Sequence, residues 1–174
     1  MTADSAVSGI RKHDQHGSIS LISQEPHPPY SRPPLSKGLW RGKPLEGIWR
    51  KTEGQGVSLL LGRTVRSVDL PGKTVTDDRG VIHGFERLLL ATGGTPRRLG
   101  LADDGVIYYR TLDDYQRLRG SMGGGKRFAV IGGGFIGSEV AAALAMNGAK
   151  VVMIFPDESV GARLFSEGVG RLLE

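Results

Sequence analysis

A glycine-rich turn between an apolar segment and an alanine-rich one constrains this chain most. Gly132, Gly134 and Gly137 form the pattern G-x-G-x-x-G. The apolar residues 128–131 before it predict a buried strand, and the alanine-rich residues 135–146 after it predict a helix. In such a turn the first glycine permits a sharp bend, the second lets a diphosphate approach the backbone, and the third lets helix and strand pack closely. The segment therefore predicts a dinucleotide site at the helix N-terminus, where N–H groups and a partial positive charge favour phosphate.

The residues after the helix complete this unit and bear on the choice of dinucleotide. Asn147 and Gly148 end the predicted helix, and residues 151–155 predict a second strand. Asp157 lies about 20 positions beyond the last glycine of the pattern, where a carboxylate can accept hydrogen bonds from ribose hydroxyls. A carboxylate there would repel a 2′-phosphate, so the sequence favours NAD over NADP. Arg163 lies close enough to keep NADP open as an alternative.

Composition excludes several other kinds of site. The chain has no cysteine, which excludes disulfides, thiolate metal sites and an internal dithiol that could relay electrons. The four histidines have no metal-like spacing, so no metal site is predicted. The net charge is +5, but the basic residues are scattered, which favours a solvated surface over a nucleic-acid patch. No apolar run approaches the roughly 20 residues of a membrane helix, and no signal pattern opens the chain. We expect a cytoplasmic protein, with the mitochondrion as the alternative.

The first two thirds of the chain predict a series of short elements. Residues 1–17 predict the end of a helix. Pro33 and Pro34 suit the first turn of a helix capped by Ser31 and running from Leu35 to Trp40. A capping box at residues 111–114 predicts a helix to about Arg119. The remaining patterns predict a strand over 18–23, one or two strands over 56–70, a turn over 70–73, a hairpin around 77–80, a buried strand over 85–94 and a linker over 121–126.

Four segments occurring in order resemble one known family. They read PYSRPPLSKGLW, LLLATGGTPR, RTLDD and VIGGGFIGSE. Together they are similar to the FAD-dependent pyridine nucleotide oxidoreductases of the ferredoxin-reductase and apoptosis-inducing-factor type. The resemblance implies an α/β chain made of incomplete tandem Rossmann-like FAD- and NAD(P)-binding domains, with parallel sheets and a small β-hairpin insertion. Residues 1–122 would form an FAD-binding domain lacking its first strand and glycine loop, and residues 123–174 the first half of an NAD(P)-binding domain, so that the chain is truncated at both ends.

The same resemblance assigns site residues. Gln24 and Glu25 would hold the adenosine ribose of FAD, and Val65 would meet its adenine. The FAD side comprises Gln24, Glu25, Arg32, Lys37, Val65, Thr92, Gly93 and Arg110. The NAD(P) side comprises Gly132, Gly133, Gly134, Phe135, Ile136, Gly137, Asp157 and Arg163.

Lys37 and Glu139 are the expected catalytic pair. Two prolines fix the backbone before Lys37, so little conformational entropy remains to be lost when the flavin binds beside it. A lysine there supplies positive charge where reduced flavin carries negative charge. In the family this lysine pairs with the glutamate just after the glycine fingerprint, which here is Glu139. We therefore predict a Lys37–Glu139 ion pair.

The predicted function is FAD-dependent NAD(P)H oxidation. Hydride passes from NADH to FAD, and electrons leave to an external acceptor such as ferredoxin, a quinone or oxygen, because the chain has no redox cysteines. We expect a fragment of reduced activity. The alternative is a non-catalytic nucleotide-binding remnant or interaction protein; a nucleic-acid-binding protein is a third, weaker reading. No membrane partner is expected, and a homodimer is left open.

Overall fold

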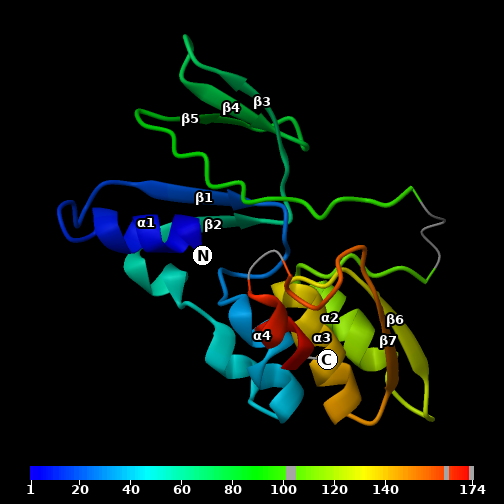
Figure 1. Cartoon of the computed structure of the whole chain (residues 1–174). Helices are drawn as coiled ribbons and strands as arrows, with labels where there is room; N and C mark the ends of the chain where they lie inside the picture. The colour runs from blue at the N-terminus through cyan, green and yellow to red at the C-terminus, as the bar shows by residue number, and fades with distance from the viewer. Residues whose placement is uncertain (101–104, 163–164, 173–174) are drawn as a thin grey trace. The chain divides into compact units, whose positions relative to one another are not determined.

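The computed structural model describes residues 1–100, 105–162 and 165–172 (Figure 1). The chain divides into two compact units that interleave in sequence. The first unit combines Met1–Ser31 with Ile48–Gly94, and the second combines Arg32–Gly47 with Thr95–Glu174. The proline-rich segment Arg32–Gly47, which carries Pro33, Pro34 and Lys37, thus packs with the later part of the chain.

The first unit contains a parallel pair of strands. Strand β1 (Ile19–Ser23) runs beside β2 (Val57–Leu61), with Ile19 opposite Val57 and Ser23 opposite Leu61. Helix α1 (Thr2–Ile10) precedes β1, and the 3₁₀ helices η3 (Leu45–Ile48) and η4 (Thr52–Gln55) precede β2. The prediction of a helix within residues 1–17 and of a strand over 18–23 is confirmed.

A buried polar network ties α1 to η4. Asp4 is 1% exposed, and its two carboxylate oxygens accept hydrogen bonds from Thr52 Oγ1 and Arg50 Nε, each at 2.7 Å. Thr52 is fully buried. Since a buried carboxylate is costly unless its oxygens have donors, these two partners are what allow Asp4 to lie inside.

A small antiparallel sheet completes the first unit. It has the order β3 (Val65–Asp69), β4 (Thr74–Asp77), β5 (Ile82–Gly84). The predicted hairpin is therefore confirmed, and residues 56–70 form two strands that belong to different sheets.

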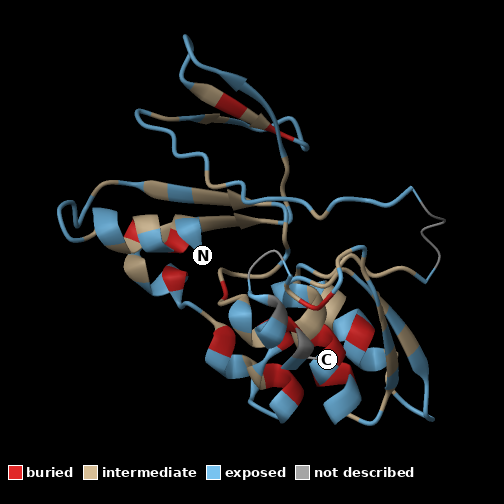
Figure 2. Cartoon of the chain, in the orientation of Figure 1, coloured by how far each residue is buried: buried red, intermediate tan, exposed pale blue. Residues whose placement is uncertain are grey.

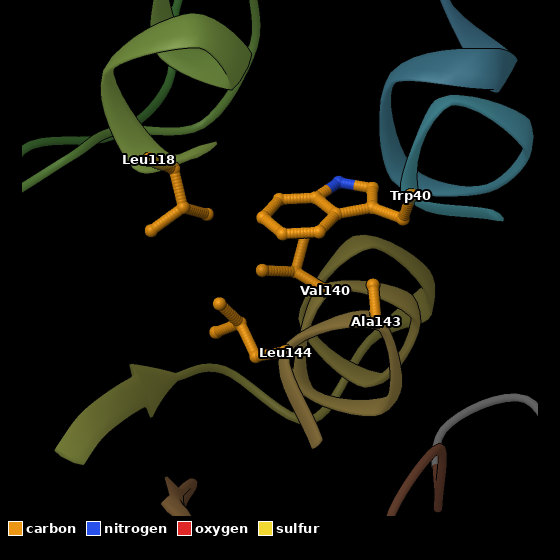
Figure 3. Close-up of a cluster of buried hydrophobic side chains, with 5 residues drawn as sticks. All are labelled: Trp40, Leu118, Val140, Ala143 and Leu144. Atoms are coloured by element: carbon orange, nitrogen blue, oxygen red, sulfur yellow. The ribbon is translucent and has the colours of Figure 1, made fainter. Parts of the chain in front are cut away.

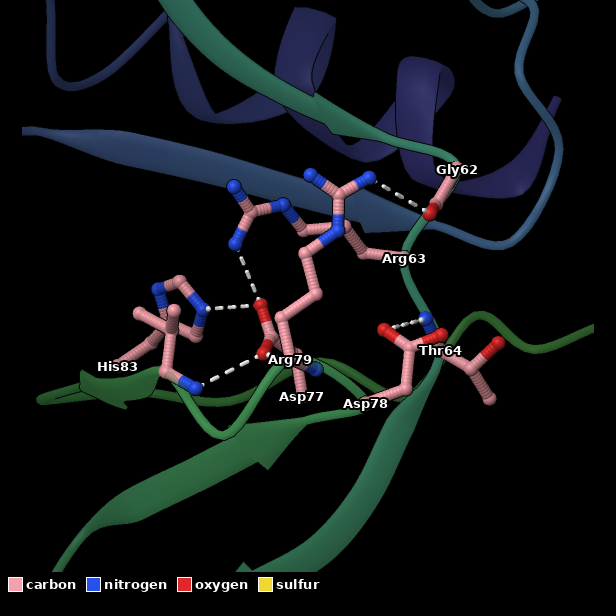
Figure 4. Close-up of polar contacts among 8 residues, drawn as sticks. Gly62, Arg63, Thr64, Asp77, Asp78, Arg79 and His83 are labelled. Atoms are coloured by element: carbon pink, nitrogen blue, oxygen red, sulfur yellow. Dashed lines mark hydrogen bonds and ion pairs between the residues drawn. The ribbon is translucent and has the colours of Figure 1, made fainter.

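Asp77 organises the turn of this hairpin (Figure 4). It is 2% exposed and lies 2.6 Å from Arg63 Nη1 and 3.2 Å from His83 Nε2, and it accepts the backbone N–H groups of Arg79 and Val81. The hydrogen bond from Arg63 outweighs the effect of burial, so the pKa of Asp77 lies well below its usual range. Arg63 lies two residues after the end of β2, so this ion pair joins the end of the parallel pair to the hairpin.

The second unit is built around one strand–helix–strand motif. Strand β6 (Arg127–Ile131), helix α3 (Phe135–Met146) and strand β7 (Lys150–Ile154) follow one another, and β6 and β7 pair in parallel. Helix α2 (Leu112–Gly120) begins at the predicted capping box, in which Thr111 and Asp114 bond reciprocally. Helix α4 (Glu167–Leu172) lies near the C-terminus. The predicted α/β class with parallel sheets is confirmed.

The core of the second unit lies between α2, α3 and the proline-rich segment. Trp40 packs against Leu118 of α2 and against Val140, Ala143 and Leu144 of α3 (Figure 3). Its ring meets Tyr115 edge to face, with centroids 5.6 Å apart. An aromatic side chain of this size contributes much of the apolar burial of a small unit.

The predicted helix from Leu35 to Trp40 is wrong. The segment forms two 3₁₀ turns instead, η1 (Pro33–Ser36) and η2 (Gly38–Arg41), and Arg32, not Ser31, occupies the N-cap position of η1. The two prolines lack N–H donors, and Lys37 has φ −128° and ψ −92°, which interrupts any continuous helix.

Two expectations of buried strands are also wrong. Residues 85–94 form no strand, and Leu88, Leu89 and Leu90 are 39%, 60% and 70% exposed. An apolar strand needs a neighbour to satisfy its backbone, and the described residues offer this segment none. Strand β6 is only partly buried, and on one face alone, where Phe128 and Val130 pack against the core. Its other face, continued in β7, exposes the apolar residues Ala129, Ile131, Val152 and Ile154. Figure 2 accordingly colours neither strand as buried.

Candidate functional site

The turn between β6 and α3 has the shape that its glycines predict. Gly132 has φ +114°, which side chains rarely tolerate, and its N–H donates to Ile154 O at 2.8 Å. A Cβ on Gly137 would lie 2.0 Å from Gly132 O. The fold itself therefore requires glycine at both positions, the first for its backbone angle and the second for the close approach of helix to turn.

Gly134 differs, because the fold does not require a glycine there. It is the N-cap of α3, with φ −84° and ψ −174°, angles open to any residue. A Cβ built on it meets nothing within 4 Å. The missing side chain leaves open space at the helix N-terminus, where the first N–H groups of a helix have no intrahelical partner. That space is what a phosphate group needs to approach the backbone.

The segment after β7 lies against this turn. Gly161 N–H donates to Gly133 O at 2.8 Å, and Phe165 meets Phe135 edge to face at 6.1 Å between centroids. Asp157 is half-buried in the same segment, three residues beyond the last residue of β7. Arg163 lies outside the described residues. The structure thus brings the glycine turn and the predicted ribose carboxylate into adjacent segments of one unit.

The predicted Lys37–Glu139 ion pair is present. Lys37 Nζ lies 2.7 Å from Glu139 Oε1, and the two side chains are 54% and 27% exposed. The second carboxylate oxygen, Oε2, accepts a hydrogen bond from Ser36 Oγ at 2.6 Å. Partial burial raises the pKa of Glu139, but the hydrogen bonds from Lys37 and Ser36 and the charge of Lys37 outweigh it and leave the pKa below its usual value.

The segment carrying Lys37 is fixed from both sides. Leu35 O accepts hydrogen bonds from Trp40 Nε1, at 2.8 Å, and from the Tyr109 hydroxyl. Arg32 Nη1 donates to Arg110 O at 2.8 Å. Burial raises the pKa of Tyr109 to about 12, so its hydroxyl remains a donor at physiological pH. These contacts hold the 3₁₀ turn against η2 and against the residues before α2.

Of the predicted FAD-side residues, Arg32, Lys37 and Arg110 belong to the second unit, and the remaining five belong to the first. Glu25 follows the carboxyl end of β1, and the hydroxyl of the buried Tyr30 donates to its carboxylate. Gln24, Thr92 and Gly93 are exposed, and Val65 opens β3 at 38% exposure. A carboxylate at the end of a parallel strand suits ribose hydroxyls, so Glu25 fits its predicted role chemically.

Sequence reasoning missed three residues that hold the others in place, namely Tyr30, Ser36 and Tyr109. Ser36 could have been suspected, because it lies beside Lys37 in the segment that carries the resemblance. Tyr30 and Tyr109 carry no such signal, since their partners are set by the folded chain.

The described residues also bear on metal sites and on membrane-spanning helices. No group of three or more His, Asp or Glu side chains there is arranged to hold a metal ion. Within the same residues, no helix has the length and apolar character needed to cross a bilayer.

Known proteins similar to this chain point in one direction. Residues 4–174 match the family model described as pyridine nucleotide-disulphide oxidoreductase. The ferredoxin–NAD(+) reductase component of the p-cumate 2,3-dioxygenase system of Pseudomonas putida is 38% identical over 173 residues, which cover 95% of this chain and 43% of that protein. Apoptosis-inducing factor 1 of Dictyostelium discoideum is 33% identical over 189 residues, covering 93% of this chain and 36% of that one.

Solved structures agree with these relatives. The covalent putidaredoxin reductase–putidaredoxin complex contains a chain that superposes with a TM-score of 0.85 at 29% identity, over 98% of this chain and 43% of its own length. This chain therefore spans less than half the length of the proteins it matches.

Proposed function

Because the chain belongs to the pyridine nucleotide-disulphide oxidoreductase family, as its motifs predicted, we propose that it contributes to FAD-dependent oxidation of NAD(P)H. NADH is the favoured donor, and a ferredoxin, a quinone or oxygen is the external electron acceptor. The ferredoxin–NAD(+) reductase and apoptosis-inducing factor among its relatives support this proposal.

One observation carries the proposal: helix α3 joins the glycine turn to the Lys37–Glu139 pair. Its N-cap is Gly134, the glycine that the fold does not require, and Glu139 lies five residues later. At the usual helical rise this separation is about 7 Å along the axis. A dinucleotide whose phosphates meet the helix N-terminus would thus extend within reach of the Lys37 ammonium group.

When bound, FAD and NAD(P)H supply the hydride chemistry. The protein's own contribution is binding and electrostatics. Gly134 leaves room for the diphosphate, Asp157 would accept hydrogen bonds from the ribose, and Arg163 is the residue that would favour NADP. Lys37 would place positive charge beside the flavin, and Glu139 would hold Lys37 there.

The predicted FAD-side residues divide by the part of the cofactor that they would contact. We propose that Gln24 and Glu25 hold the adenosine ribose, that Val65 meets the adenine, and that Arg32 and Lys37 lie beside the flavin. Thr92, Gly93 and Arg110 would also contact the FAD. In this assignment residues 1–122 form an FAD-binding region and residues 123–174 part of an NAD(P)-binding region. We still predict a cytoplasmic location, with the mitochondrion as the alternative. Whether the chain forms a homodimer is left open.

The alternative is a nucleotide-binding remnant or interaction protein without redox activity. The exposed apolar residues of β6 and β7 favour it, because a large exposed apolar patch is typical of an interaction surface. Visible flavin absorption in the purified protein supports the oxidoreductase. A colourless protein that NADH still stabilises supports the remnant.

The sharpest test compares two glycine variants in NADH binding. Gly134→Ala adds a methyl group in the space reserved for phosphate, whereas Gly54→Ala adds one in open space within the first unit. We expect NADH to raise the melting temperature of the wild type and of Gly54→Ala, and to raise that of Gly134→Ala much less. Equal stabilisation of all three proteins, or of none, would contradict the proposed site. Retention on DNA that salt abolishes and NADH does not affect would instead indicate a nucleic-acid-binding protein.

A further inference from the structure

Glu139 has two carboxylate oxygens, and adjacent residues of one short turn bind them separately. Lys37 Nζ lies 2.7 Å from Oε1, and Ser36 Oγ donates to Oε2 at 2.6 Å. The resemblance that predicted the ion pair gave no role to the serine.

The two donors differ in how firmly they are held. Ser36 is 5% exposed, and rotation about a single bond, Cα–Cβ, sets the position of its Oγ. It follows Leu35, whose carbonyl is held by two donors, Trp40 Nε1 and the Tyr109 hydroxyl. Lys37 is 54% exposed on a flexible four-carbon side chain. Lys37 therefore loses more side-chain entropy than Ser36 when it binds the carboxylate, so it is the weaker of the two in fixing where that carboxylate lies.

A buried hydroxyl on a rigid turn therefore fixes the carboxylate better than the ammonium group does. Hydrogen bonds to an ionised carboxylate are short and strong, and this one also removes the rotational freedom of the carboxyl group. When Ser36 holds Oε2, the carboxylate can no longer rotate, so the position of Oε1 is also set. Lys37 then binds Oε1 at that position.

We propose that Ser36 is a positioning residue that orients Glu139 and, through Glu139, sets the position of the Lys37 ammonium group. The proposal rests on the proposed function, in which Lys37 acts beside the flavin. In that function, the placement of the Lys37 cation would depend on a buried neutral side chain, Ser36.

The direct test is the titration of Glu139 in the full chain, followed by ¹³C NMR of its carboxyl carbon. Ser36→Ala removes one of the hydrogen bonds that lower the pKa of Glu139, so the midpoint should rise. The matched control is Ser138→Ala, which removes a hydroxyl one residue from Glu139 that donates to the backbone oxygens of Gly134 and Phe135. Ser36→Thr keeps the hydroxyl and should restore the wild-type midpoint. A midpoint that Ser36→Ala leaves equal to that of Ser138→Ala would overturn the proposal.

A second measurement tests orientation without relying on Ser36→Ala to fold. In Lys37→Met, the nuclear Overhauser contact between the Ser36 β-protons and the Glu139 γ-protons should persist, because Ser36 holds the carboxylate by itself. Loss of that contact would show that Lys37 positions Glu139, which is the reverse of the proposal. In Ser36→Ala the corresponding contact between Lys37 and Glu139 should weaken.

Neither readout needs a bound nucleotide, so the outcomes separate cleanly from those of the proposed function. If the chain fails to bind NADH but the titration midpoint of Glu139 depends on Ser36, the nucleotide site is disproved and the positioning role of Ser36 stands. A chain that binds NADH with an unchanged midpoint disproves the positioning role alone.

Discussion

The two parallel strand pairs of this protein have the same size but are built differently. Strands β6 and β7 are joined by one turn and one helix, and the hydrogen bonds described for the glycine turn come from within residues 132–161. Strands β1 and β2 are joined by residues 24–56, which include the proline-rich turns that pack in the other unit. The comparison teaches that a binding turn can be encoded in a short segment, whereas a site assembled from distant segments depends on the whole fold.

The two pairs also differ in what stabilises them. The β6–β7 unit depends on close backbone packing at glycine and on an apolar core around Trp40. The β1–β2 unit depends on buried polar groups, Asp4 with Thr52 and Asp77 with Arg63. Each unit contains one tryptophan, Trp40 or Trp49, so fluorotryptophan NMR can follow the two units separately.

The largest effect is expected from Gly137→Ala. Its Cβ would lie 2.0 Å from a backbone oxygen, so helix and turn must separate. We expect a loss of about 3 kcal/mol in the unfolding free energy, the upper end for overpacking, seen at the Trp40 resonance in urea. The Trp49 resonance should be unaffected. Equal shifts at both resonances would show that the two units unfold together.

Thr52→Val should have a somewhat smaller effect on the other unit. It removes the donor to Asp4 Oδ1 and leaves a buried oxygen unsatisfied, which costs about 2 kcal/mol. The loss should appear at the Trp49 resonance in a urea titration. Thr95→Val, at an exposed position, is the control and should leave the unfolding free energy unchanged. A Thr52 variant as stable as this control would contradict the role given to the buried network.

Acid should loosen the small antiparallel sheet before it affects the glycine turn. The pKa of Asp77 is lowered in the folded protein, mainly by Arg63. The contribution of Asp77 to folding stability is therefore fully present above its ordinary pKa near 4, and it is lost as pH falls toward the lower folded pKa. Hydrogen exchange of the amides of β4 and β5 should therefore lose protection as pH is lowered below about 4. Asp77→Asn should show weaker protection that no longer varies over that range. A wild-type sheet whose protection does not change in acid would disprove this linkage.

The smallest effect on stability is expected from Val152→Thr. Val152 is 57% exposed on the open face of the β6–β7 sheet, so the unfolding free energy should change by less than about 0.5 kcal/mol. The fluorescence of a dye that binds apolar surface should fall. A large destabilisation would mean that another surface covers this face in solution, for example a second copy of the chain.

The sequence predicted the local motifs well and the long-range arrangement less well. The glycine turn, the capping box at Thr111 and the hairpin around Asp77 were all predicted, because each depends on residues close together in the chain. The Lys37–Glu139 pair was predicted only through the family resemblance, since nothing in the spacing of these residues indicates contact.

The failures have physical causes. Residues 85–94 have the composition of a buried strand, but a strand forms only where another strand can pair with it, and composition does not reveal the neighbour. The helix expected over 35–40 failed because prolines suit the first turn of either helix type, and the backbone angles of Lys37 decided between them. Ser36 and Tyr109 were missed because their partners lie 103 and 74 positions away.

The separation between Ser36 and Glu139 also has a consequence for biosynthesis. The two residues are 103 positions apart, and a ribosome adds about 5 to 20 residues per second. The turn that carries Ser36 and Trp40 must therefore wait on the order of 5 to 20 s before helix α3 emerges to receive it. During that interval the indole ring of Trp40 has not yet met its partners Leu118, Val140 and Leu144, and such exposed apolar surface favours nonspecific association.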